Sequence, residues 1–220
     1  MTRQLTILTV YAAAMALLES AVVVYMRRLY YPNDPLQLFP LQFLATYDPL
    51  LELAREAATI VMIVTVALLA ESTSLTRRFA AFVFVFGVWD LFYYFWLKVL
   101  MGWPVSWLEW DVLFLIPGVW LGPWVCPALI SLLFIVWGTW TLRSGRRISF
   151  ASHSLIVFLS GAAIGVATFL QPAVAVWWEA DAELRHYTPT GFCWWLFLAS
   201  YLMMAFGLGM TLRGAKLDQP

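Results

Sequence analysis

The stretch from Gly87 to Lys98 places charged side chains inside a run that is otherwise apolar enough to lie in a lipid bilayer. Residues three and four positions apart are neighbours on a helix, so one face of the predicted helix collects Gly87, Asp90, Tyr94 and Lys98. An ionised carboxylate at the centre of a membrane helix costs about 2.5–3.5 kcal/mol on insertion scales. The sequence therefore predicts that Asp90 meets a base, a cation or a proton that offsets this cost.

The composition is that of a membrane protein. Of the 220 residues, 63% are hydrophobic and 12% are charged, whereas soluble domains carry about 25% charged residues. A soluble chain of this length could not bury so much apolar surface, so we expect the lipid bilayer to be its solvent. The 13 Trp residues fit aromatic belts at the two membrane interfaces. A net charge of zero argues against a nucleic-acid partner.

Six apolar runs predict an all-α, polytopic integral membrane protein that forms a single transmembrane domain over 1–220. The expected spans are about 5–26, 49–70, 79–100, 123–142, 154–170 and 192–212. The first run is longer than the ~7–15 apolar residues of a signal peptide and favours a retained helix.

A short helix over about 107–116 is expected between the third and fourth spans. Ser106 and Glu109 have the spacing of a capping box, and Asp111 would lie in the first turn. The helix must stop near Pro117, and its ten or so residues rise only ~15 Å, half a bilayer. We therefore predict a re-entrant or interfacial helix rather than a seventh span.

Three acids on the first three spans fall at one level of the membrane. At 1.5 Å per residue, Glu19, Glu56 and Asp90 lie roughly 9–14 Å below one surface of the bilayer core. Two bases, Arg55 and Lys98, reach the same layer. The predicted pocket consists of Glu19, Glu52, Arg55, Glu56, Asp90, Tyr94 and Lys98.

Four of these residues are acids and two are bases, so a surplus of acid remains. Buried carboxylates without full pairing take up a proton or bind a cation, which predicts a pocket for a proton, a cation or a small polar or cationic ligand. The other interpretation is structural: the charges pair and hold the first three spans together. Glu52 and Lys98 lie near the interface, where solvation alone would account for them.

The basic residues predict the orientation. Eight lie on the side of the two termini and five on the other. The positive-inside rule then places both termini in the cytoplasm, with the pocket facing outward across a bacterial inner membrane.

The remaining chemistry-bearing residues are few. Cys126 and Cys193 fall near the outer ends of two spans, where they form either a disulfide or two buried thiols. His153 and His186 are too far apart for a helical metal site, and the charged loop around His186 fits a solvated segment better than a metal centre. No cofactor motif and no metal site are predicted.

Three functions stay open at this point. The protein could bind or pass a ligand at the pocket. It could be a non-catalytic subunit that packs against other membrane subunits, with Gly161 and Gly165 as a small-residue contact face. It could also be a membrane-embedded enzyme for a lipid or isoprenoid, with Asp90 or Glu56 as general acid or base. The sequence contains no nucleophile–base pair and no Asp-Asp-x-x-Asp motif that would favour the enzyme.

Overall fold

A computed structural model describes residues 2–39, 49–71, 74–144, 146–148, 150–178, 191–213 and 216–217. Six of its helices are long and apolar enough to cross a membrane, which confirms the all-α, multi-pass class. They are α1 (Thr2–Tyr30), α3 (Pro49–Ala70), α4 (Leu75–Met101), α5 (Val125–Arg143), α6 (Ser152–Trp178) and α7 (Trp194–Arg213). The charged loop that contains His186 lies outside the described residues.

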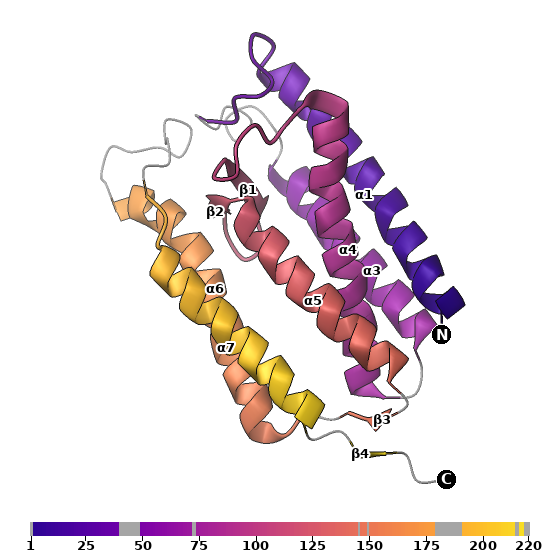
Figure 1. The fold of residues 1–220 in the computed structure, drawn as a ribbon. Coiled ribbons are helices and arrows are strands. Elements are labelled where there is room, and N and C mark those ends of the chain that lie inside the picture. The colour runs from indigo at the N-terminus through magenta and orange to yellow at the C-terminus, as the bar shows by residue number, and fades with distance from the viewer. Residues whose placement is uncertain are drawn as a thin grey trace.

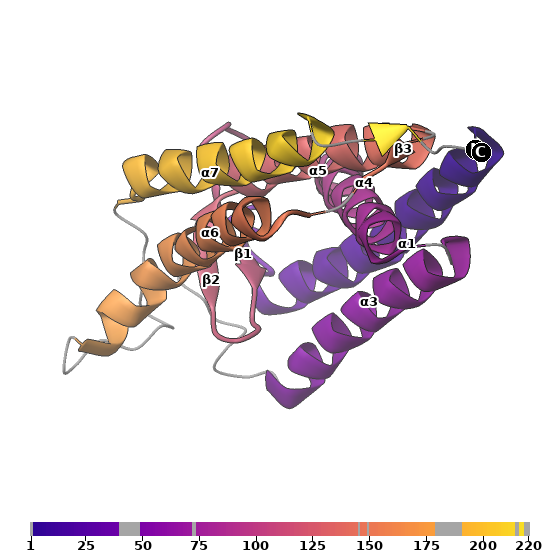
Figure 2. The same cartoon turned by 90° about the horizontal axis from the view of Figure 1, so that it is seen from below.

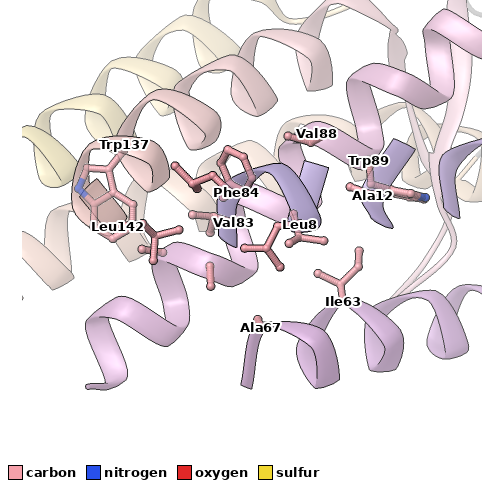
Figure 3. Close-up of a cluster of buried hydrophobic side chains, with 14 of the residues drawn as sticks. Leu8, Ala12, Ile63, Ala67, Val83, Phe84, Val88, Trp89, Trp137 and Leu142 are labelled. Atoms are coloured by element: carbon pink, nitrogen blue, oxygen red, sulfur yellow. The ribbon is translucent and has the colours of Figure 1, made fainter. Parts of the chain in front are cut away.

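Helix α4 is the centre of the bundle. It packs against α1, α3 and α5, with α1 and α3 on one side of it and the α6–α7 pair on the other (Figures 1 and 2). Figure 3 shows the apolar core where α4 meets its neighbours. Its buried side chains include Leu8 and Ala12 of α1, Ile63 and Ala67 of α3, Val83 and Phe84 of α4, and Trp137 and Leu142 of α5. A helix that is apolar all round is expected at the interior of such a bundle.

The ends of α4 have recognisable caps. Ser74 precedes the helix with extended backbone, and its hydroxyl accepts a hydrogen bond from the backbone N–H of Arg77. Gly102 ends it in the left-handed conformation, at a φ of 80° that favours glycine. The helix therefore begins before the predicted residue 79 and ends close to the predicted residue 100.

Helices α4 and α5 approach closely at Gly87. A Cβ atom there would lie 2.6 Å from the Ser131 carbonyl oxygen and 3.0 Å from Cγ1 of Ile135. Replacing Gly87 by Ala should therefore push the two helices apart and destabilise the protein by about 1–3 kcal/mol, measured as a lower thermal midpoint in detergent. Gly209→Ala is the matched control, because nothing lies within 4 Å of its added Cβ. Equal midpoints for the two variants would contradict the close crossing.

The predicted helix over 107–116 is wrong, because this segment forms a β-hairpin. Strands β1 (Trp110–Phe114) and β2 (Trp120–Pro123) pair antiparallel, with Asp111 opposite Gly122. The Glu109 carboxylate accepts hydrogen bonds from the N–H groups of Val105 at 2.6 Å and Ser106 at 3.0 Å. The contact with the Ser106 N–H group is one that a capping box makes, but here it closes a turn that continues into a strand. Aromatic and β-branched residues then favour extended pairing over a short helix.

A second pair of strands joins two loop segments at the other end of the bundle. Strand β3 (Arg146–Arg147) follows α5 and pairs antiparallel with β4 (Lys216–Leu217), which follows α7. The hairpin of β1 and β2 lies at the end of the bundle opposite the start of α1 (Figure 1). The acids predicted for the pocket lie toward that hairpin end, because they line a cavity together with residues of β1.

Candidate functional site

A cavity of about 90 Å³ lies between α1, α3, α4 and the β1 segment. A water molecule needs about 10–15 Å³ measured in this way, so the cavity has room for several waters or a small ligand. Six of the seven residues predicted for the pocket line it, namely Glu19, Glu52, Arg55, Glu56, Asp90 and Tyr94. The structure therefore brings together acids from the first three spans.

Arg55 joins two helices across one side of this cavity. Its guanidinium group pairs with Glu19 of α1 and with Glu52, one turn earlier on α3. Arg55 Nε donates to both Glu52 oxygens, at 3.1 and 3.0 Å. Thr59, one turn later on α3, donates to Glu19 Oε2 at 3.4 Å. The polar side chains of Arg55 and Thr59 on α3 thus face α1, and the Arg55 guanidinium group pairs with two carboxylates.

In the part of the chain that the structure describes, the hydrogen-bond partners of Glu56 and Asp90 are neutral groups. Glu56 Oε2 accepts the backbone N–H of Leu115 at 2.9 Å, which ties α3 to the segment that follows β1. Asp90 Oδ2 accepts the hydroxyl of Ser131 at 2.8 Å, across the close approach of α4 and α5. Both acids are buried, at 8% exposed each. Neither forms a salt bridge with any residue in the described ranges.

The structure adds a charged pair that the sequence reasoning missed. Arg27, near the end of α1, pairs with Asp111 of β1 at 3.3 Å, and their side chains are 3% and 4% exposed. The Arg27 Cζ atom also lies 4.0 Å from the ring centroid of Trp103. The predicted pocket does not include Arg27, and the prediction for Asp111 was the first turn of a short helix. Alternation of aromatic and β-branched residues over 110–114 was the available signal, since a strand turns alternate side chains to one face.

Burial raises the pKa of the Asp111 carboxyl to about 6, and Arg27 and the Val112 N–H group limit the rise. A carboxyl whose pKa is raised by folding contributes most to stability below its unfolded pKa, and that contribution is lost as the pH rises. The thermal midpoint of the wild type, relative to that of Asp111→Asn, should therefore fall between pH 4 and about pH 6 and then level off. A difference that rises over this range would contradict the dominance of burial.

Lys98 does not belong to the cavity. It is exposed, and its ammonium group donates to the carbonyl oxygens of Gly102 at 2.9 Å and Pro104 at 2.8 Å. It therefore closes the C-terminal end of α4, where a cation is also favoured by the helix dipole. Arg27, and not Lys98, is the second base that lines the cavity beside Arg55. Five carboxyl groups and two guanidinium groups line the cavity, so the surplus of acid is larger than predicted.

The two cysteines do not form a disulfide. Both are free, with Cys126 buried and Cys193 half-buried. Cys126 packs in an apolar cluster with Phe169 and Phe197. In the part of the chain that the structure describes, no three His, Cys, Asp or Glu side chains are grouped as ligands for one metal ion. The acids of the cavity are instead distributed around its wall.

Comparison of the chain with protein-family models, with curated proteins and with solved structures finds no match.

Proposed function

We propose that this multi-pass membrane protein binds or passes a cation, a proton or a small cationic ligand at the cavity between α1, α3 and α4. The observation that carries the proposal is the pair of buried acids, Glu56 and Asp90, that form no salt bridge in the described residues while lining a cavity large enough for a ligand. Arg55 is already shared by Glu19 and Glu52, and Arg27 is paired with Asp111.

Electrostatics supports a positively charged occupant. Taking a carboxylate out of water is costly unless an opposite charge or a proton accompanies it. The cavity wall also includes Trp89 and Tyr93, whose rings stack with centroids 6.4 Å apart. Aromatic faces attract cations, and quaternary ammonium groups are bound by such rings in many proteins. An organic cation would therefore find both charge and aromatic surface in this cavity.

Tetramethylammonium is a suitable first probe, because it carries charge without hydrogen-bond donors. We expect it to raise the thermal midpoint of the purified protein, since a ligand that binds only the folded state stabilises it by mass action. Glu56→Gln and Asp90→Asn should each weaken its binding about tenfold or more, because a cation about 4 Å from a carboxylate gains roughly 1–4 kcal/mol, depending on the effective dielectric constant, and about 1.4 kcal/mol corresponds to tenfold. Isothermal titration calorimetry gives the dissociation constants.

Glu109→Gln is the control for this experiment. Glu109 is an acid at the same end of the bundle, and its carboxylate accepts backbone hydrogen bonds of a turn outside the cavity. The proposal would be contradicted if tetramethylammonium bound equally strongly to all variants, or if Glu109→Gln weakened its binding as much as Glu56→Gln and Asp90→Asn do. Proton passage is tested separately with a pH-sensitive dye trapped in proteoliposomes, where Asp90→Asn should abolish the flux.

The outward orientation and a bacterial inner membrane belong to the same proposal. The hairpin end of the bundle is opposite the start of α1, and the basic residues favour cytoplasmic termini. A fluorescent-protein fusion at the C-terminus should be fluorescent in the cytoplasm, and an alkaline phosphatase fusion there should be inactive.

The subunit interpretation receives no added support from the small-residue face of α6. A Cβ at Gly161 would lie 2.8 Å from the Met204 backbone nitrogen, and one at Gly165 would lie 2.7 Å from the Ser200 hydroxyl. Helix α7 of the same chain therefore occupies that face.

A further inference from the structure

The cavity has a second wall whose chemistry differs from that of the acids. Arg27 lines it and is 3% exposed, yet its Nε and Nη1 atoms have no hydrogen-bond partner in the described part of the chain. In the described residues Nη2 alone is used, in the contact with Asp111 Oδ1, and Asp111 Oδ2 is likewise buried without a hydrogen-bond partner. The Trp103 ring offers a cation–π contact but no oxygen acceptor. Two buried N–H donor positions are thus left at the edge of a cavity.

Unmet donors on a buried guanidinium group indicate what would complete this wall. More than nine-tenths of buried polar groups in proteins have hydrogen-bond partners. Guanidinium N–H groups match the oxygens of carboxylates and phosphates best, and such charge-assisted hydrogen bonds are short and strong. The Arg27 wall therefore favours an oxyacid group, whereas Glu56 and Asp90 favour a positive charge.

We propose that the ligand is a small zwitterion, with its cationic centre toward Glu56 and Asp90 and its carboxylate or phosphate on Arg27. This inference rests on the proposed cation-binding function and names its ligand class. A simple anion is disfavoured because five carboxyl groups line the same cavity. A simple cation satisfies the acids but offers no oxyacid group to the Arg27 donors. A molecule that carries both groups satisfies both walls at once.

The test compares three small probes: glycine betaine, tetramethylammonium and acetate. Betaine and tetramethylammonium both carry a quaternary ammonium group, and betaine adds a carboxylate. We expect betaine to bind the wild type about tenfold more tightly than tetramethylammonium, the size of one charge-assisted hydrogen bond. Acetate should bind more weakly than either. Isothermal titration calorimetry in detergent measures all three affinities.

Variants then locate the source of the difference. The double variant Arg27→Gln/Asp111→Asn removes both charges together, so that neither is left alone in the interior. In it, betaine should lose its advantage while the affinity for tetramethylammonium changes less than about threefold. Arg27→Lys keeps the charge but not the planar array of donors, and it should lose most of the advantage as well. Arg28→Gln, an exposed neighbour, is the control and should bind all three probes as the wild type does.

The outcomes separate this inference from the function on which it rests. Tetramethylammonium that binds no more weakly than betaine overturns the zwitterion but leaves the cation site standing. A betaine advantage that persists in both Arg27 variants also overturns it, because the carboxylate would then lie elsewhere. Failure of both probes to bind, together with no loss of proton flux in Asp90→Asn, overturns the proposed function and this inference together.

Discussion

Replacing Arg27 by Met will destabilise the protein by about 3–5 kcal/mol, the usual cost of removing one partner from a buried ion pair. Arg27 and Asp111 are both almost fully buried, and Arg27 is the one base that Asp111 contacts in the described ranges. The variant leaves the Asp111 carboxylate in the interior without a base. The thermal midpoint should fall by roughly 10 °C, as expected for a chain of this size.

The adjacent residue gives a matched control for this prediction. Arg28 is exposed, so Arg28→Met should leave the midpoint within about 2 °C of the wild type. The double variant Arg27→Met/Asp111→Leu should recover most of the stability, because replacing a whole buried pair by apolar residues is often neutral or stabilising. Equal effects of the two Met variants would mean that the pair is solvated and that the interior is not dry.

The six spans and the gathering of acids could be predicted because both follow from local regularities. Apolar runs of about 20 residues define the spans, and a rise of 1.5 Å per residue fixes the depth of each side chain. That arithmetic placed Glu19, Glu56 and Asp90 at one level. In the structure all three acids line one cavity, because α1 and α3 both pack against α4.

The hairpin could not be predicted from the same regularities. The Ser106–Glu109 spacing is satisfied equally by a helix start and by a turn, and the residues that decide between them lie in β2, further along the chain. Asp111 is buried by a contact with Arg27, 84 residues away in sequence. Lys98 lies outside the cavity, which agrees with the alternative of solvation near the interface. A long flexible side chain can turn toward either end of its helix, and the Lys98 ammonium group donates to the carbonyl oxygens of Gly102 and Pro104 after α4.

Arg55 should be as important to stability as Arg27, because it is shared by two acids on two helices. Replacing it by Met leaves Glu19 and Glu52 without a base and removes the ion pair between α1 and α3. We expect a loss of about 3–5 kcal/mol, measured as a lower thermal midpoint in detergent. Arg55→Lys should fall between the wild type and Arg55→Met, since a single ammonium group cannot reproduce the fork that reaches both carboxylates.

Two further variants decide whether that loss comes from uncompensated charge. Lys98→Met removes a cation at the same end of the bundle, but that cation is exposed and its hydrogen-bond partners in the described residues are carbonyl oxygens, so we expect a loss of less than about 1 kcal/mol. Adding Glu19→Gln and Glu52→Gln to Arg55→Met removes the carboxylates that would lack a base. This triple variant should recover most of the fall in thermal midpoint that Arg55→Met causes. If the triple variant stays as unstable as Arg55→Met, the guanidinium group acts through packing, and the acids of the cavity do not require a positive charge. The case for a cationic ligand beside Glu56 and Asp90 would weaken with it, because all of these acids share one cavity.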